Sequence, residues 1–222
     1  MSEELTVLYR DDSIICCVKE PGTVSEEPGM PSLIRRSLGL PEVYCVHRLD
    51  RDTGGVMAFA LNRNSAASLS RSFSSEGSAC KRYLTVISGA MEEKSGTLND
   101  LLFHDSRKNH SYIVDRVRKG VREASLQYET LAECGGMSLI SVLLHSGRTH
   151  QIRVQFSGRQ HPVAGDRRYG SDMDCPLALW ASILSFDHPV TGERIDVCSS
   201  PPNRFPWDQF TDQIQSGMPL RP

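Results

Sequence analysis

The sequence predicts an α+β fold, in which one domain is built on a largely antiparallel mixed sheet with flanking helices and loops. Short runs of apolar and β-branched residues recur along the chain, and Gly, Pro, Asn and Asp separate them, as is typical of strands joined by turns. Stretches with apolar residues at helical spacing are few and short. A chain of 222 residues can bury a sizeable core, so we expect residues 1–222 to form a single domain.

The N-terminal part of this fold is predicted to contain three strands and one helix. Residues 5–18 have the pattern of two strands joined by a polar turn. A loop rich in Pro, Gly and Glu follows, after which Ser32 is expected to cap a helix over residues 32–38 that ends at Gly39. The apolar run of residues 54–61 is typical of a buried strand.

The remainder of the chain alternates between strands and short helices. A helix is expected to begin at Asn64 or Ser65, because apolar residues follow at helical spacing. Residues 98–122 are polar and charged, as expected of loops and an exposed hairpin, and residues 149–156 are predicted to form another helix. The further predicted strands cover residues 83–87, 125–133, 137–144, 177–186 and 195–198.

Composition argues against several classes of protein. No apolar stretch approaches the roughly 20 residues that span a bilayer, and the acidic start lacks the features of a signal peptide. We therefore expect a cytoplasmic protein with no membrane partner. The seven cysteines include no C-x-x-C pair, which indicates buried thiols rather than a disulfide framework. His145 and His150 lie five apart, off the helical face that a zinc site needs, so no metal is expected.

Charge is distributed unevenly along the chain. The net charge of −2 is unlike that of strongly basic nucleic-acid-binding domains. Residues 44–168, however, hold 18 Lys and Arg against 12 Asp and Glu, whereas the flanks hold 7 against 15. A basic middle between acidic ends permits a phosphate-binding face, although runs of charge are usually solvated surface.

Three polar clusters interrupt the apolar strands, at residues 47–55, 145–153 and 161–166. Each cluster alone has an ordinary structural explanation. Asp50, for example, lies between Arg48 and Arg51, where a carboxylate commonly forms a surface ion pair or caps a turn. Together, the three clusters indicate a site with catalytic or binding chemistry.

The sequences of these clusters, and their order along the chain, resemble the motifs of a known family. HRLDRDTGG (residues 47–55) resembles the HRLD-x-x-T-S-G signature of RluA-type pseudouridine synthases, and KRYLTVISG (81–89) resembles the strand that follows it in that family. SGRTHQIRVQF (146–156) and HPVAGDRRYG (161–170) resemble the segments G-R-T-H-Q-I-R-V-H and H-P-I-x-G-D-x-x-Y-G. The opening VLYRDDSIICCVKEPG and the segment LALWASILSFDHPVTGE are similar to the family's first and last motifs, so the likeness covers almost the whole chain.

The resemblance implies an enzyme that converts uridine in RNA to pseudouridine without a cofactor, in a central RNA-binding cleft. Asp50 matches the catalytic aspartate, which attacks either the ribose anomeric carbon or carbon 6 of the base. A buried carboxylate needs a nearby cation to stay ionised, and Arg153 matches the family's partner arginine. Tyr83 matches the tyrosine that stacks on the uracil, and its hydroxyl is a candidate to accept the proton from carbon 5.

The resemblance also implies contacts with RNA, either tRNA or rRNA. Arg48 matches an arginine that fills the place of the flipped base. No separate N-terminal RNA-binding domain is expected, so RNA binding falls to the catalytic domain, which we expect to act as a monomer. The further predicted RNA-binding residues are His47, Arg51, Lys81, Arg82, Arg148, His150 and Gln151. The polar insert adds Arg107, Lys108, Arg116, Arg118 and Lys119 as candidates.

Four departures from the family pattern keep a second hypothesis open. Gly54 stands where the family has Ser, Glu20 is inserted in K-P-x-G, Trp180 replaces a His, and Val154-Gln155 replaces V-H. An RNA-binding protein that has lost catalysis on the same fold is therefore an alternative. A hydrolase using Asp50 with His47 or His150 is a third hypothesis, which explains none of the other motifs.

Overall fold

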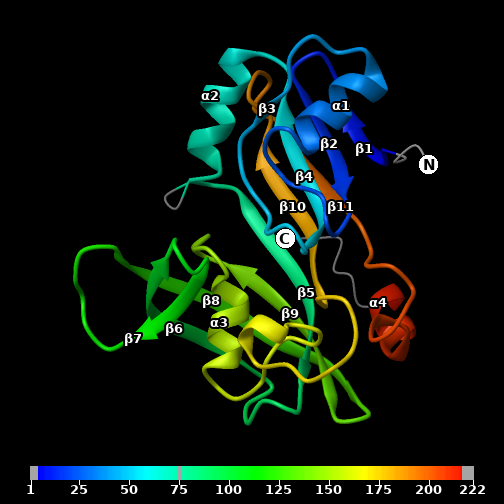
Figure 1. Ribbon diagram of the computed structural model, residues 1–222. Helices are drawn as coiled ribbons and strands as arrows, with labels where there is room; N and C mark the ends of the chain where they lie inside the picture. Colours follow the sequence, from blue (N-terminus) through cyan, green and yellow to red (C-terminus); the bar gives the residue numbers. More distant parts are fainter. Residues whose placement is uncertain (1–4, 75–76, 217–222) are drawn as a thin grey trace. The chain divides into compact units, whose positions relative to one another are not determined.

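The computed structural model describes residues 5–74 and 77–216, which divide into two compact units. Among the described residues, unit 1 comprises residues 5–74, 77–81 and 181–200, and unit 2 comprises residues 82–180 and 201–216. Figure 1 shows strands and short helices in both units. The α+β prediction with a largely antiparallel sheet is confirmed, whereas the single domain stays a prediction.

Unit 1 is built on the strand order β1-β2-β4-β10, with β3 beside β4 and β11 beside β10. Its pairs β1·β2, β2·β4, β3·β4 and β10·β11 are antiparallel. The strands are β1 (Val7–Arg10), β2 (Ile14–Lys19), β3 (Tyr44–Cys45), β4 (Gly54–Ala60), β10 (Leu179–Asp187) and β11 (Arg194–Cys198). The central strands β2 and β4 are buried along their whole length, as continuous apolar runs predict.

Two helices belong to unit 1, and both begin earlier than predicted. Helix α1 (Met30–Leu38) carries Pro in its first turn, where a missing N–H costs nothing, and Ser32 therefore lies inside the helix instead of capping it. Gly39 ends α1 in the left-handed conformation, as expected. Helix α2 (Arg63–Ser72) is capped by Asn62, whose side chain accepts a hydrogen bond from the N–H of Ser65.

Unit 2 has the strand order β5-β9-β8-β6-β7. The strands are β5 (Cys80–Ser88), β6 (Ser95–Asp105), β7 (His110–Val114), β8 (Val121–Cys134) and β9 (Met137–Leu144). The pairs β6·β7, β6·β8 and β8·β9 are antiparallel. The exposed hairpin predicted within residues 98–122 corresponds to β6 and β7, and strands take up more of this range than the predicted loops do, because a solvent-facing hairpin tolerates polar residues on both faces.

The short helices of unit 2 complete the fold. The four elements are α3 (Gln151–Ser157), η1 (Arg167–Tyr169), η2 (Trp207–Phe210) and α4 (Thr211–Ser216). Among the described residues, no helix is long and apolar enough to cross a membrane.

Each unit has its own apolar core. In unit 1, Leu69 of α2 and Phe73 after it pack on β2, β4, β10 and β11. In unit 2, Val154 of α3 and Tyr169 pack on Leu102 and Ala124 of β6 and β8. Val46, directly before residues 47–53, packs against the first core, and Val154 places α3 on the second.

Candidate active site

Asp50 lies in residues 46–53, which connect β3 to β4 in unit 1. Asp50 is half-buried, and its carbonyl accepts a hydrogen bond from the N–H of Thr53 at 3.1 Å, which closes a turn. Leu49 next to it is buried, whereas Arg48 and Arg51 are exposed. We call residues 47–53 the nucleophile segment from here on, after the role that the sequence predicts for Asp50.

Lys19 anchors the nucleophile segment by binding its backbone. It is fully buried at the end of β2, and its Nζ donates to the carbonyl oxygens of Glu20 (3.2 Å), Thr23 (2.8 Å) and Arg51 (2.8 Å). Burial lowers the pKa of Lys19 to about 8, against the opposing effect of the Asp52 and Asp50 carboxylates. No role was predicted for Lys19, although a lysine closing an apolar strand is a signal that was available.

Arg51 is tied to the same loop. The N–H of Gly22 donates to the carbonyl of Arg51 at 2.8 Å, and the Nε of Arg51 donates to the carbonyl of Gly22 at 2.9 Å. The structure therefore gives the Arg51 side chain an internal contact, while its predicted RNA contact stays a prediction.

His47 and Lys81 also make internal contacts. The Nε2 of His47 accepts the backbone N–H of Ala58 at 3.0 Å, and its ring stacks on Phe73 with centroids 4.4 Å apart. Desolvation, with Lys81 nearby, lowers the pKa of His47 to about 3, so the ring is neutral. Lys81 donates to the carbonyl of Phe73 at 3.3 Å. These geometries support a structural role for both residues, and their RNA contacts stay predictions.

Arg48 differs from its neighbours in the nucleophile segment. Its side chain is 65% exposed and lies 3.5 Å from the carboxylate of Glu26, which is itself 55% exposed. Such an exposed ion pair contributes little free energy. Its guanidinium is thus held only weakly by Glu26.

In unit 2, Tyr83 and Arg82 are neighbours on β5. Successive side chains of a strand point to opposite faces, so these two residues face opposite sides of the sheet. Tyr83 is buried. Arg82 donates to the Oγ of Ser141 at 3.3 Å and lines a polar groove of about 430 Å³ with Gln127 and Glu129. The predicted RNA contacts of Tyr83 and Arg82 stay predictions.

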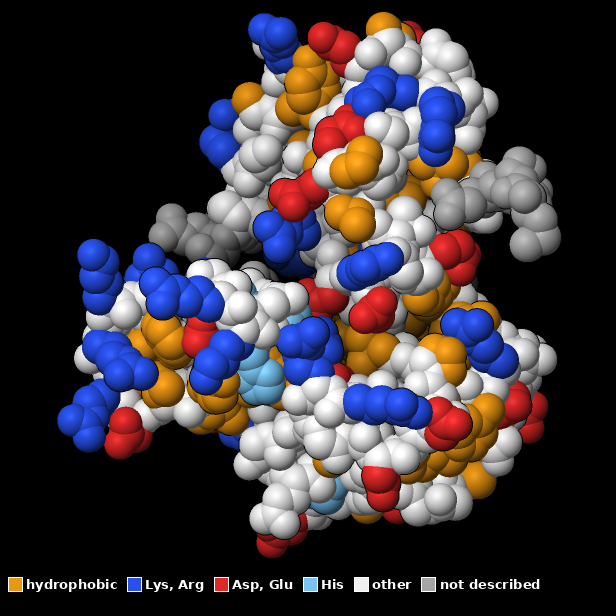
Figure 2. Space-filling view, viewed as in Figure 1, with side chains coloured by type: hydrophobic (Ala, Val, Ile, Leu, Met, Phe, Trp, Pro, Cys, Tyr) orange, Lys and Arg blue, Asp and Glu red, His pale blue; other side chains and the backbone are white. Residues whose placement is uncertain are grey.

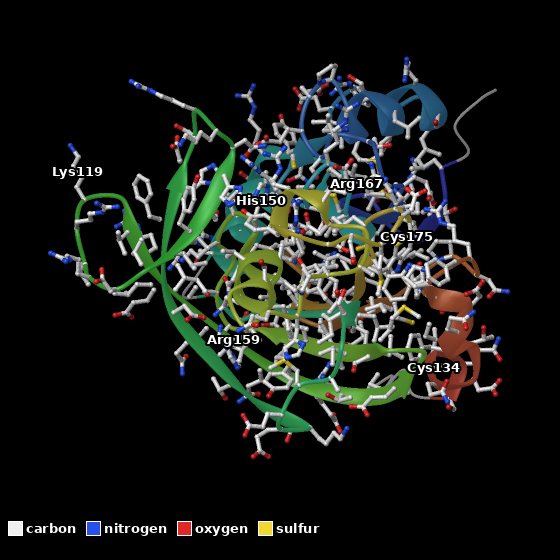
Figure 3. The ribbon with its side chains drawn as sticks, turned by 60° about the horizontal axis from the view of Figure 1, so that its bottom comes forward. Lys119, Cys134, His150, Arg159, Arg167 and Cys175 are labelled. Atoms are coloured by element: carbon white, nitrogen blue, oxygen red, sulfur yellow. The ribbon has the colours of Figure 1, made fainter. Side chains whose placement is uncertain are left out.

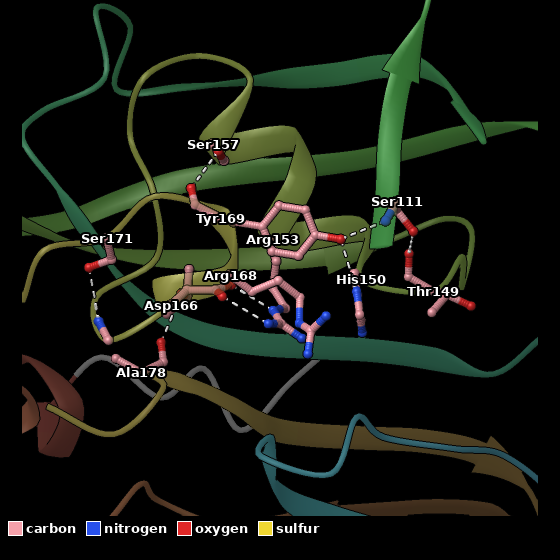
Figure 4. Close-up of polar contacts among 12 residues, drawn as sticks. Ser111, Thr149, His150, Arg153, Ser157, Asp166, Arg168, Tyr169, Ser171 and Ala178 are labelled. Atoms are coloured by element: carbon pink, nitrogen blue, oxygen red, sulfur yellow. Dashed lines mark hydrogen bonds and ion pairs between the residues drawn. The ribbon is translucent and has the colours of Figure 1, made fainter. Parts of the chain in front are cut away.

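Arg153 on α3 forms a buried ion pair with Asp166. Its Nε and Nη2 donate to the two carboxylate oxygens of Asp166, at 2.6 and 2.8 Å, and both side chains are at least nine-tenths buried (Figure 4). The guanidinium also lies 5.1 Å from the ring centroid of Tyr169. This bidentate geometry fixes the plane of the guanidinium. The predicted pairing of Arg153 with Asp50 joins residues of the two units and stays a prediction.

Tyr169 links the Arg153 pair to a second layer of polar groups. Its hydroxyl accepts the N–H of Ser111 at 2.8 Å and is hydrogen-bonded to the Nδ1 of His150 at 2.9 Å (Figure 4). Burial raises the pKa of Tyr169, so the phenol is protonated. His110 stacks on the same ring with centroids 4.4 Å apart. Asp166 and Tyr169 lie in a motif that the sequence resemblance singled out, but the motif alone assigned them no role.

His150, Gln151 and Arg148 were predicted to contact RNA, and each has internal partners. His150 is buried before α3 with a left-handed backbone. The amide of Gln151 accepts from Ser146 and from the N–H of Arg148, and donates to the carbonyl of Ser125. Arg148 donates to the carbonyl of Glu123. Their RNA contacts stay predictions.

Among the residues that the structure describes, no three His, Cys, Asp or Glu side chains lie close enough together to bind a metal ion.

Comparisons with known proteins point to one family. A family model described as RNA pseudouridylate synthase matches residues 13–158, which include Asp50, Tyr83 and Arg153. An uncharacterised RNA pseudouridine synthase of Mycobacterium bovis is 32% identical over 221 residues, covering 90% of this chain and 70% of that protein. Another, of Synechocystis, is 32% identical over 219 residues, covering 90% and 67%.

Solved structures support the fold. The human protein RNA Pseudouridylate Synthase Domain Containing 1 aligns with a TM-score of 0.78 at 24% identity, covering 97% of this chain and 96% of that one. Human RNA Pseudouridylate Synthase Domain Containing 4 aligns with a TM-score of 0.77 at 20% identity, covering 93% and 92%.

Proposed function

This chain belongs to the RNA pseudouridylate synthase family, and we propose that it isomerises specific uridines of a structured RNA with Asp50 as nucleophile. In this reaction the bond from ribose to uracil N1 breaks, the base turns, and ribose is joined to carbon 5. The carbon 5 proton is lost and N1 gains a proton, so substrate and product are isomers.

The observation that carries the proposal is the anchoring of the nucleophile segment. Lys19 and Gly22 both hold the carbonyl of Arg51, directly after Asp50, through hydrogen bonds to the backbone. The Asp50 carboxylate is half-buried, and the backbone beside it is fixed by these hydrogen bonds. This arrangement suits a nucleophile, which must be held in position to attack one atom of the substrate. The carboxylate attacks either the ribose anomeric carbon or carbon 6 of the base, and both routes stay open.

Arg153 supplies the positive charge in this proposal. A guanidinium has five N–H donors, and the Asp166 contact uses two of them, on one edge. The role of Asp166 is to hold Arg153 in a buried position that would otherwise be costly for a lone cation. Tyr83 is proposed to stack on the target uracil, which fits a buried aromatic side chain on β5.

RNA binding is proposed to use Arg48 and a basic surface on unit 2. The weak Glu26 contact leaves the exposed Arg48 able to move toward RNA and replace the flipped base. Figure 2 shows Lys and Arg side chains gathered over the β6–β7 hairpin, and Lys119 extends from the loop between β7 and β8 (Figure 3). This basic hairpin surface consists of Arg107, Lys108, Arg116, Arg118 and Lys119, all exposed.

We further propose that the protein acts as a monomer in the cytoplasm on tRNA or rRNA. The alternative of an inactive RNA-binding protein is kept open by Gly54, Glu20 and Trp180, which depart from the family motifs. Both hypotheses expect RNA binding, so only a measurement of turnover separates them.

The test is incubation with tRNA and rRNA pools that carry tritium at uracil carbon 5. The proposal expects tritium release in proportion to the pseudouridine that appears in the RNA digest. RNA binding without release would support the inactive protein, and free uracil as a product would support a hydrolase. Mapping the pseudouridine that disappears when the gene is deleted would identify the RNA.

A further inference from the structure

Ser25 lies in the loop between β2 and α1, outside every predicted motif, yet it contacts the nucleophile segment directly. Its side chain is buried, with 4% of the residue exposed. The Oγ of Ser25 donates to the carbonyl of Leu49 at 2.8 Å and accepts the N–H of Leu49 at 3.0 Å. One hydroxyl therefore satisfies both backbone groups of the residue that precedes Asp50.

These two bonds act on two successive peptide groups. The N–H of Leu49 belongs to the peptide that enters Leu49, and its carbonyl belongs to the peptide that leads into Asp50. Holding both groups from one oxygen restricts the two backbone dihedrals of Leu49. A hydroxyl can do this because it has one donor and two acceptor positions, whereas Ala and Gly have neither in their side chains.

The Ser25 contact complements the anchors on the other side of Asp50. Lys19 and Gly22 hold the carbonyl of Arg51, so the backbone is fixed on both sides of Asp50 from the same loop. Leu49 itself is buried, so its N–H and carbonyl would lack water if the hydroxyl were removed. The direction in which the Asp50 side chain leaves the backbone thus depends on Ser25.

We propose that Ser25 is a positioning residue for Asp50, an inference that rests on the proposed function. Ser25 contacts only the backbone of the segment and not the substrate. Its loss should therefore misplace the nucleophile without weakening RNA binding. A displacement of about 1 Å at a reacting group can cost about 100-fold in rate, so we expect an effect on kcat and not on KM.

The experiment compares Ser25→Ala with Ser138→Ala. Ser138 is also fully buried and donates to a backbone carbonyl, that of Gly89 at 2.7 Å, but it lies in unit 2 outside the proposed site. Steady-state tritium release over a range of RNA concentrations, and RNA affinity, are measured below the melting temperature of both variants. We expect Ser25→Ala to lose about 10- to 100-fold in kcat with KM within about threefold of wild type, and Ser138→Ala to keep kcat within about twofold.

Two further variants make the test decisive. Ser25→Thr keeps the hydroxyl and should recover most of the lost rate. Ser25→Cys lengthens and weakens both bonds; it should lose at least about fivefold in kcat and serves if Ser25→Ala does not fold. Amide exchange of residues 47–53 should be faster in Ser25→Ala than in Ser138→Ala, because the Leu49 N–H loses its partner.

The outcomes separate this inference from the proposed function. If the wild-type protein releases tritium and a folded Ser25→Ala or Ser25→Cys does so with the wild-type kcat, the positioning role alone is overturned. A loss confined to KM would also overturn it. Absence of release from wild type would overturn the proposed function, and the positioning role with it.

Discussion

The two units hold their candidate catalytic groups in different ways. In unit 1, the contacts of Lys19, Gly22 and Ser25 all act on the backbone of the nucleophile segment. In unit 2, Arg153 is held through its own charge, by a carboxylate that is equally buried. Backbone hydrogen bonds are worth about 1 kcal/mol each, whereas breaking a buried ion pair costs about 3–5 kcal/mol. Single substitutions at these contacts should therefore lower the free energy of unfolding more in unit 2 than in unit 1.

The largest expected effect is that of Asp166→Ala. It leaves the Arg153 guanidinium buried without its carboxylate, so the free energy of unfolding should fall by about 3–5 kcal/mol. Denaturant unfolding measures this change. Asp174→Ala is the matched control, because Asp174 forms an exposed pair with Arg167 and should change stability by less than about 0.5 kcal/mol. Equal effects of the two substitutions would remove the contrast between the units.

Tyr169→Phe tests whether the neutral part of the unit 2 network also matters. The substitution leaves the buried N–H of Ser111 without its acceptor and should lower the free energy of unfolding by about 2 kcal/mol. Tyr112→Phe, at an exposed tyrosine, should stay within about 0.5 kcal/mol of wild type. If Tyr169→Phe lowers the free energy of unfolding by no more than Tyr112→Phe does, the Tyr169 hydroxyl is dispensable for stability.

The pH dependence of stability tests His47 in unit 1. Its pKa is lowered from 6.5 to about 3, so below pH 6.5 the unfolded chain binds a proton that the folded chain does not. Its contribution to stability is present above pH 6.5 and is lost as the pH falls toward 3, by about 1 kcal/mol between pH 6.5 and 5.5.

Urea unfolding of His47→Gln at several pH values should show a shallower loss over this range than wild type. His145→Gln, at an exposed histidine, should keep the wild-type slope. Identical slopes in all three proteins would mean that the His47 ring is solvated in the folded chain.

The smallest expected effect belongs to the exposed pair of unit 1. Glu26→Gln should change the free energy of unfolding by less than about 0.5 kcal/mol, because both side chains of the Arg48 pair are solvated. RNA affinity at low salt should rise by about twofold as Arg48 loses its competing carboxylate. Filter binding measures the affinity, and a decrease would assign Glu26 a favourable role in RNA binding.

The local sequence pattern was sufficient to predict the buried strands but not to predict where the helices begin. Residues 137–144 were predicted with the bounds of β9, because an apolar run between turn residues needs no distant information. Helix α2 was misplaced by one or two residues, because Asn62 was not recognised as its cap. The long strand β8 was underestimated because its outer face is polar.

Sequence motifs supplied the candidate site residues, and the structure adds side-chain contacts around them that no motif indicated. Asp50, Tyr83 and Arg153 came from motifs, whereas Asp166, Lys19 and Ser25 act through contacts that depend on how separate segments pack. His47 and Gln151 were assigned to RNA because sequence shows that a side chain is polar but not that another part of the fold satisfies it. Burial of a polar group is a tertiary property, so it appears only in the structure.

Asp50→Ala in the tritium-release assay tests the central claim most directly, with Asp52→Ala as the matched control. Asp52 is an exposed carboxylate two residues away in the same segment. We predict that Asp50→Ala lowers the single-turnover rate by more than about 1,000-fold while RNA affinity stays within about threefold, and that Asp52→Ala stays close to wild type. A folded Asp50→Ala that retained a substantial part of the wild-type rate would contradict the assignment of Asp50 as the nucleophile.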